Sequence, residues 1–213
     1  MTPFRLLDLI VPAAPPLCAG CGAWAGAAEP LCGRCRRGLR WLGPEPARAG
    51  AVAVWAPLAY AGPARGVVRE LKFRGGARLA RPMAAQIHAS APPGWLDAAA
   101  LVPVPLHPAR RRRRGYNQAE RLAAELGALA GVPVRDCLER AGPRVTQVGR
   151  GRAERLAGIA GRVRVRAPPP PGRIVLVDDV VTTGGTLAAC AQALREHGVR
   201  DLAAVAYART PGR

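Results

Sequence analysis

The sequence predicts an α/β fold, in which helices flank a parallel sheet and a small zinc-binding element comes first. Residues 174–177 are four consecutive apolar residues, as in a strand that is buried on both faces of a parallel sheet. An amphipathic helix is expected to follow, with an apolar stripe from Leu187 to Leu194 and Gly198 where it would end. Two Cys-x-x-Cys pairs near the start of the chain are typical of a metal-binding element.

The composition allows one α/β domain with a small appendage. The chain has 213 residues, of which 49% are hydrophobic, so a sizeable core can form. The formal net charge is +18, and nearly all of the basic residues are arginines, since Lys72 is the single lysine. Such an excess favours phosphate-bearing partners, either nucleotides or nucleic acid. A general bias toward Ala, Arg, Gly and Pro is the alternative explanation for part of the charge.

The N-terminal residues predict neither a membrane span nor a signal sequence. No apolar run approaches the roughly 20 residues of a membrane-spanning helix. The segment 4–14 is apolar, but Asp8 interrupts it and Arg5 provides the whole of its basic front. We therefore expect a cytoplasmic protein. Residues 4–10 are expected to form a short helix that Pro12 ends.

A zinc site is expected in the next segment. Cys18 and Cys21 form one Cys-x-x-Cys knuckle, and Cys32 and Cys35 form a second after ten intervening residues. Four thiolates on two tight turns would complete a structural tetrahedral Zn²⁺ site. Disulfides are the alternative, which a reducing cytoplasm disfavours. Several arginines surround the second knuckle, either as a nucleic-acid contact or as a solvated rim.

A linker rich in glycine and proline, residues 43–50, separates an N-terminal part, residues 1–45, from a main domain, residues 51–213. In the main domain we expect a strand over 52–60, helices over 65–73 and 77–89, and a short strand over 101–106. Further strands are expected over 132–134, 161–167 and 201–207, with a helix over 118–130. The segment 140–155 is polar, contains glycine and lacks periodicity, which is typical of a mobile lid.

Five consecutive arginines, residues 110–114, follow the expected strand 101–106 and precede the expected helix 118–130. A loop at this position could bind pyrophosphate. It could equally bind a nucleic-acid backbone, or the run could be a solvated charged face. The sequence leaves these three interpretations open.

The residues after the central strand indicate a sugar phosphate ligand. Asp178 and Asp179 stand where the strand is expected to end, and a Thr/Gly loop over 182–186 follows. In open α/β sheets, ligands bind at the carboxyl ends of the strands. Gly184 and Gly185 let the backbone approach an anion, and free N–H groups at the start of the next helix attract phosphate. The carboxylates can accept hydrogen bonds from vicinal sugar hydroxyls or help place a divalent cation. A loop suited to phosphate and acids suited to a sugar diol together indicate a ribose 5-phosphate.

Residues 174–186 resemble the phosphoribosyl-pyrophosphate (PRPP) motif of type I phosphoribosyltransferases. A Walker B strand is the rival interpretation, but the sequence contains no Walker A segment. Nearly the whole chain is similar to the ComF family, which joins a four-cysteine zinc element to a type I phosphoribosyltransferase-like domain. The resemblance is carried by the four cysteines, by the segments 72–75, 102–105, 114–118, 146–147 and 154–155, by Arg140 and by the PRPP motif.

The resemblance implies a role for each of four groups of residues. Asp178 and Asp179 would be the catalytic pair, which holds the ribose diol and Mg²⁺. The PRPP and its 5-phosphate would bind to Val180, Val181, Thr182, Thr183, Gly184, Gly185 and Thr186. The pyrophosphate would bind to Leu106, His107, Pro108, Ala109 and Arg110. The lid would carry Arg140, Gln147 and Arg155.

The resemblance also implies a phosphoribosyltransferase of unknown acceptor that acts in competence, the uptake and processing of DNA. PRPP or a related ribose phosphate, single-stranded DNA, a competence helicase and single-strand-handling proteins are the implied partners. The alternative is a non-catalytic scaffold that binds nucleic acid or a protein on the same fold. The chain departs from the family after Arg155, where Gly158 stands near the usual asparagine and no phenylalanine occurs before Val163.

Overall fold

The computed structural model describes residues 17–26, 30–73, 76–140 and 163–211. Its main sheet has the strand order β1-β2-β8-β7-β4, and the short β3 pairs with β8. Only β1 and β2 are antiparallel, and the other pairs of this sheet are parallel. The strands are β1 (Ala47–Ala49), β2 (Val52–Trp55), β3 (Leu58–Ala59), β4 (Ala100–Pro103), β7 (Ile174–Val181) and β8 (Leu202–Arg209). The predicted α/β class with a mostly parallel sheet is confirmed.

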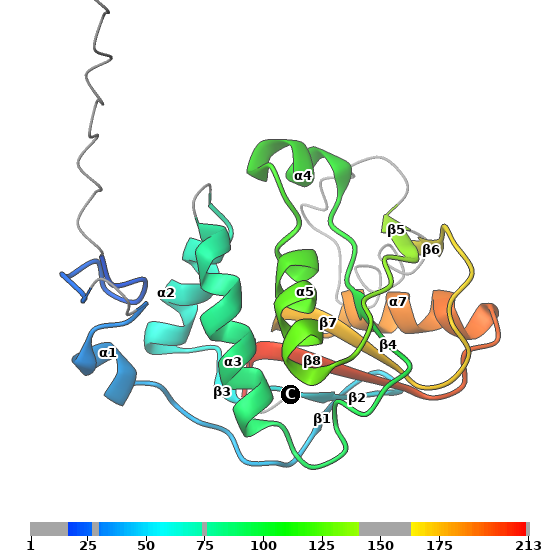
Figure 1. Cartoon of the computed structure of the whole chain (residues 1–213), viewed down its shortest axis with the longest axis horizontal. Coiled ribbons are helices and arrows are strands. Elements are labelled where there is room, and N and C mark those ends of the chain that lie inside the picture. The colour runs from blue at the N-terminus through cyan, green and yellow to red at the C-terminus, as the bar shows by residue number, and fades with distance from the viewer. Residues whose placement is uncertain (1–16, 27–29, 74–75, 141–162, 212–213) are drawn as a thin grey trace, which may run out of the picture.

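Helices cover both faces of this sheet. The helices α2 (Gly62–Leu71), α3 (Ala80–Ser90) and α5 (Gln118–Ala130) lie together on one face (Figure 1). The helix α7 (Gly185–Glu196) packs on the other face, against β1 and β2. None of the described helices is long and apolar enough to cross a membrane.

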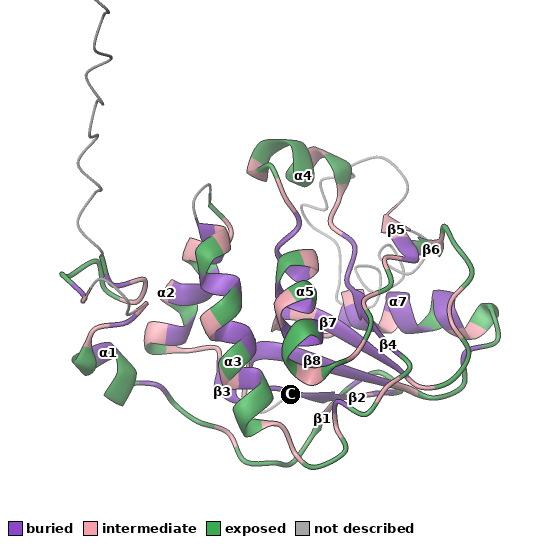
Figure 2. Ribbon diagram, viewed as in Figure 1, coloured by how far each residue is buried: buried purple, intermediate pink, exposed green. Residues whose placement is uncertain are grey.

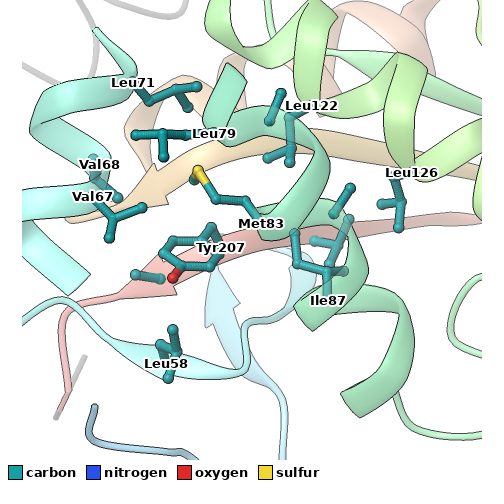
Figure 3. Close-up of a cluster of buried hydrophobic side chains, with 14 of the residues drawn as sticks. Leu58, Val67, Val68, Leu71, Leu79, Met83, Ile87, Leu122, Leu126 and Tyr207 are labelled. Atoms are coloured by element: carbon teal, nitrogen blue, oxygen red, sulfur yellow. The ribbon is translucent and has the colours of Figure 1, made fainter. Parts of the chain in front are cut away.

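Alternation along β7 divides the core into two clusters. Val175 and Val177 belong to the cluster under α2, α3 and α5, whereas Ile174 and Leu176 belong to the cluster under α7. Figure 3 shows the first cluster, in which Leu58, Val67, Val68, Leu71, Leu79, Met83, Ile87, Leu122, Leu126 and Tyr207 are labelled. Both faces of β7 are therefore buried, as its run of apolar residues predicts.

The helices on either side of the site begin and end at local signals. The Asn117 side chain accepts a hydrogen bond from the Ala119 N–H and so caps α5, and Gly131, with φ 69°, ends it. The expected helix 118–130 is confirmed to the residue. The helix α7 is also confirmed, with Gly198 at φ 87° just after its end.

Several expected elements have different bounds. The expected strand 52–60 is two short strands, because Ala56 and Pro57 interrupt it and proline has no N–H for a ladder. The expected helix 77–89 begins as a 3₁₀ turn, η1 (Gly76–Leu79), before α3. The expected strand 132–134 is reduced to one bridge between Val134 and Leu101. The strands β5 (Leu138–Arg140) and β6 (Val163–Val165) form a separate antiparallel pair.

The arginine run is a helix, not the loop that we expected. The helix α4 (Pro108–Arg114) starts with proline in its first turn, where the missing N–H costs nothing. The His107 imidazole accepts the Ala109 N–H and caps it, and Gly115, with φ 85°, ends it. Figure 2 shows that α4 is largely exposed above the buried strands. Of the predicted pyrophosphate segment, Leu106 and His107 therefore precede a helix, and the other residues form its first turn.

The cysteine-containing element packs directly against α2. A short helix, α1 (Gly33–Arg37), begins at the second knuckle. A Cβ on Gly66 of α2 would lie 2.6 Å from the Ala19 carbonyl oxygen and 2.8 Å from the Gly20 Cα, so only glycine allows this approach. The buried Cys18 and Cys35 belong to the same core cluster as α2. The expected helix 4–10 lies outside the described residues, and the predicted division into parts 1–45 and 51–213 stays a prediction.

Candidate functional site

The four predicted zinc ligands come together. The sulfur atoms of Cys18, Cys21, Cys32 and Cys35 all lie within 4.8 Å of one another. The Cys21 and Cys32 sulfurs are 3.8 Å apart, far longer than the ~2.05 Å of a disulfide bond. A tetrahedral ion with Zn–S bonds of about 2.3 Å separates its sulfur ligands by about 3.8 Å. The donor set and its spacing therefore fit Zn²⁺.

The two buried thiols of this cluster, Cys18 and Cys35, differ in acidity. Burial raises the pKa of Cys18, but backbone N–H groups of Cys32, Cys21 and Gly20 outweigh it and lower the pKa to about 6. One of these donors, the Cys32 N–H, lies 3.3 Å from the Cys18 sulfur. Burial, and then hydrogen bonds with the other thiols, raise the pKa of Cys35. A divalent cation would favour the thiolate form of both Cys18 and Cys35.

The two acids lie within β7 rather than at its end. β4 pairs with β7 only as far as Pro103 opposite Val177, and β8 continues alongside β7 to Val181. Asp178 and Asp179 therefore belong to a part of the strand that has lost its neighbour on one side. The strand prediction was too short here, and Val180 and Val181 are strand residues, because pairing with β8 extends the ladder.

Asp179 faces α2 and α5. Its side chain is 3% exposed, and its Oδ2 lies 2.8 Å from the Lys72 ammonium. The contact is an ion pair rather than an aligned hydrogen bond, since Oδ2 has no hydrogen-bond partner among the described residues. The Gln118 amide lies 3.4 Å from the other carboxylate oxygen. The end of α2 and the start of α5 thus both contact one of the predicted catalytic acids.

Asp178 faces the α7 side, because neighbouring strand residues point to opposite faces. One of its oxygens turns back to accept the Asp179 N–H at 2.8 Å. Burial, and then the Asp179 carboxylate, raise the pKa of Asp178 well above its ordinary value. On the same side, burial raises the pKa of Cys190, and the Asp178 charge adds to this effect.

Two segments that the sequence analysis used only as marks of resemblance meet at this site. The Tyr116 hydroxyl contacts the backbone carbonyls of Leu71 and Phe73 as a hydrogen-bond donor. These two residues flank Lys72 in the chain. The Arg114 guanidinium donates to Gln118 at 2.9 Å. Burial lowers the pKa of Arg114, and the charge of Asp179 opposes this shift. Sequence reasoning gave Lys72 and Gln118 no role, although a single lysine in an arginine-rich chain was an available signal.

Replacement of Lys72 by methionine is expected to lower the free energy of unfolding by about 3 kcal/mol, because Asp179 would be left buried without a cation. This is the low end of the range for such a change, since the Lys72 side chain is 25% exposed. The double variant Lys72→Met with Asp179→Asn is expected to recover most of the loss. Urea unfolding of both single variants and the double variant measures the coupling. Additive losses would contradict the ion pair.

The predicted phosphate loop is positioned by its glycines. Gly184 has φ 75°, and a Cβ there would lie 2.5 Å from the Ala49 Cβ, so this position requires glycine twice over. The helix α7 begins at the next residue with no side-chain cap, which leaves its first N–H groups for a ligand. Thr182 and Thr183 are exposed and Thr186 is half-buried beside them. The geometry allows an anion to bind here.

Some of the remaining predicted site residues lie within the described part of the chain, and others lie outside it. Arg140 ends β5 and pairs with Val163 of β6, which packs in the core cluster under α7, so Arg140 lies on the Asp178 side of β7. Gln147 and Arg155 lie outside the described residues. On α4, Arg111 forms an ion pair with Glu120. The predicted lid and the predicted pyrophosphate segment both stay predictions.

Comparison with protein families gives a match over residues 74–213 to the phosphoribosyl transferase domain. The chain is 34% identical over 114 residues to Competence protein F of Haemophilus influenzae. The aligned region covers 52% of this chain and 50% of that protein. It is 30% identical over 204 residues to the DNA utilization protein YhgH of Salmonella typhi, covering 91% of this chain and 84% of the relative. The chain thus spans half of the first relative and most of the second.

Among solved structures, orotate phosphoribosyltransferase from Aeropyrum pernix is similar, with 20% identity and a TM-score of 0.37. The superposition covers 62% of this chain and 57% of that one. At these values the structural likeness carries no conclusion of its own, and the sequence relatives carry the comparison.

Proposed function

Because this chain belongs to the phosphoribosyltransferase-domain family, and within it to the ComF group, we propose that it binds PRPP with Mg²⁺ at the carboxyl end of β7. Its activity would be the transfer of the ribose 5-phosphate group from pyrophosphate to an acceptor. The observation that carries this proposal is the position of Asp178 and Asp179. They lie where β7 has lost its β4 neighbour, and only Val180 and Val181 separate them from the loop before α7, a helix whose first turn has no side-chain cap.

Each end of the ligand has a partner of suitable chemistry. The 5-phosphate would bind to the loop residues Thr182 to Thr186 and to the first N–H groups of α7. The ribose hydroxyls would donate to the two carboxylates, whose oxygens also suit a hard cation. Mg²⁺ bound with PRPP would neutralise the charge of the pyrophosphate. The segment 106–110, before and within the first turn of α4, would contact that pyrophosphate.

The reaction would need positioning and charge stabilisation more than acid–base chemistry. A nucleophile of the acceptor would form a bond to ribose C1 as the bond from C1 to the pyrophosphate oxygen breaks. The transition state would have oxocarbenium character, which the nearby carboxylates stabilise electrostatically. Lys72 and Gln118 would contact Asp179 and not the ligand, and their role would be to hold the Asp179 carboxylate in place.

The cysteine cluster would hold a structural Zn²⁺ ion. Four sulfur ligands leave no open position for a substrate, so the ion would stabilise the element and take no part in phosphoribosyl transfer. Its contact with α2 would connect zinc binding to the main domain, because α2 leads to Lys72.

Calorimetric titration with PRPP and Mg²⁺ tests the proposed function. We expect PRPP to bind with a Kd of about 1 μM, which corresponds to a binding free energy of about −8 kcal/mol. Binding should be at least about tenfold weaker when Mg²⁺ is chelated. Ribose without phosphates is the matched control ligand and should not bind measurably. Equal heats with PRPP and with ribose would overturn the proposal.

A second candidate is a scaffold that binds nucleic acid, and the arginines of α4 favour it. Four of the five arginines of this short helix, Arg110 to Arg113, are exposed, and among these four only Arg111 forms an ion pair with an acid of the described residues. The names of the relatives connect them to competence and DNA utilization. Single-stranded DNA, a competence helicase and single-strand-handling proteins are therefore the partners of this alternative.

The salt dependence of DNA binding separates the two candidates. A scaffold would bind a single-stranded oligonucleotide with an affinity that falls steeply with salt, and that Arg112→Gln with Arg113→Gln weakens. PRPP binding should be unchanged in this variant if the transferase proposal is right. A chain that binds the oligonucleotide but not PRPP would favour the scaffold.

A further inference from the structure

The segment between α4 and α5 contacts the end of α2 through one side chain. The Tyr116 hydroxyl lies against the backbone carbonyls of Leu71 and Phe73, at 3.1 Å from the second of them. These carbonyls flank Lys72, whose ammonium lies 2.8 Å from the Asp179 carboxylate. We propose that Tyr116 is a positioning residue, which holds the end of α2 so that Lys72 fixes Asp179 at the proposed ribose site.

The end of α2 needs a hydrogen-bond donor from elsewhere in the fold. Leu71 is the last residue of this helix, and the last carbonyls of a helix have no intrahelical N–H partner. Many helices end at a left-handed glycine, but the cap here is Lys72, with φ −84° and ψ −7°. A phenolic hydroxyl can donate in place of the missing N–H. Removal of the Tyr116 hydroxyl would therefore loosen the turn that carries Lys72.

The backbone at Tyr116 is held on both sides. The residue before it, Gly115, ends α4 with φ 85°. The residue after it, Asn117, is buried, caps α5 and donates to the Val104 carbonyl at 3.0 Å. Tyr116 is thereby anchored to the segment that continues β4, and it is half-buried. A donor that is fixed in this way can set the position of a helix end, which a mobile side chain could not do.

The same segment reaches Asp179 from the α5 side as well. Arg114 donates to Gln118 at 2.9 Å, and the Gln118 amide lies 3.4 Å from the Asp179 carboxylate. The Asp179 side chain is 3% exposed, so its orientation depends on these protein neighbours rather than on water. In the described part of the chain no hydrogen bond joins Tyr116 to Asp179 itself. The hydroxyl therefore acts on the carboxylate through the end of α2.

Titration of the full-length chain with PRPP and Mg²⁺ is the first test, and here the inference rests on the proposed function. Tyr116→Phe removes only the hydroxyl, and it is expected to weaken binding about fivefold, because Asp179 loses its fixed orientation. In the Lys72→Met background the same change should have no further effect, since the hydroxyl acts through Lys72. Tyr60→Phe is the matched control and should bind like the unmodified chain. Tyr60 is also half-buried, and its ring faces Arg65 at 5.6 Å.

Urea unfolding without ligand is the second test, and it does not depend on PRPP. Tyr116→Phe and Asp179→Asn are compared singly and together. A hydroxyl that only supports α2 predicts additive losses of stability, because no hydrogen bond joins the two side chains. Positioning predicts that Tyr116→Phe costs at most about half as much once Asp179 is neutral, since the ion pair that the hydroxyl supports is then absent. This comparison needs no Lys72 variant, so it also applies if Lys72→Met does not fold.

The outcomes separate this inference from the proposed function. Unchanged PRPP affinity in Tyr116→Phe, or equal weakening with and without Lys72, overturns the role of Tyr116. Equal weakening by Tyr60→Phe overturns it as well. An unmodified chain that does not bind PRPP contradicts the transferase, and the unfolding comparison then decides the role of Tyr116 alone. Non-additive losses support that role, and additive losses overturn it.

Discussion

Replacement of Cys35 by alanine is expected to abolish zinc binding and to unfold the cysteine-containing element. Cys35 is 7% exposed and belongs to the core cluster under α2, so the variant loses a ligand and a packed side chain together. Structural zinc contributes apparent binding free energies on the order of 10 kcal/mol to small elements that fold around it. We expect zinc content to fall from one ion per chain to none, with increased proteolysis around residues 17–42.

Cys137→Ala is the matched control for this experiment. Cys137 is also a buried free thiol, but it packs in the other core cluster and is no member of the four-sulfur cluster. This variant should lose some stability through the small cavity it leaves, yet keep one zinc ion per chain. Measurement of zinc by mass spectrometry decides between the outcomes. A Cys35→Ala chain that retains stoichiometric zinc would contradict the tetrahedral site.

Substitution of both acids, Asp178→Asn with Asp179→Asn, is expected to weaken binding of PRPP and Mg²⁺ at least about 100-fold. Two charged acceptors would be lost, each worth roughly 1.5–3 kcal/mol in hydrogen bonds to a ligand. Calorimetry of the double variant measures the effect. The control is Asp97→Asn, at an exposed position distant in sequence from the two acids. Unchanged affinity in the double variant would remove the acids from the site.

The single variant Asp178→Asn is expected to bind ligand poorly and yet to be more stable than the unmodified chain without ligand or metal. Burial and the Asp179 carboxylate raise the pKa of Asp178, so the folded chain holds this proton more tightly than the unfolded chain. The stability that results is present at low pH and is lost as pH rises from the ordinary aspartate value through the raised one. At neutral pH the charged form therefore costs stability, which asparagine avoids. Unfolding measured against pH in the presence of chelator should show a flatter profile for the variant.

Local signals explain how much of the fold the sequence predicted. The helix 118–130 has both of its ends in the sequence, as Asn117 and Gly131, and its bounds were right. The signals for α4 were equally local, with Pro108 in the first turn and Gly115 at the end. They were missed because the arginine run was interpreted by its charge and not by its caps. Arginine is also a good helix former.

Long-range contacts explain what the sequence could not give. The length of β7 depends on β8, since the two strands remain paired through Val181 and Arg209. The Lys72 contact to Asp179 joins residues that are far apart in the chain, and no spacing rule connects them. Sequence motifs located the acids and the loop, and the fold supplied the cations around them.

A crystal structure of the chain with PRPP and Mg²⁺ tests the central claim most directly. We predict density for the ribose within hydrogen-bond distance of Asp178 and Asp179, and for the 5-phosphate at the loop that precedes α7. Such a ligand would sit beside β7, where β4 has turned away. Density for the ligand elsewhere on the protein, or a loop free of phosphate at saturating ligand, would contradict the account.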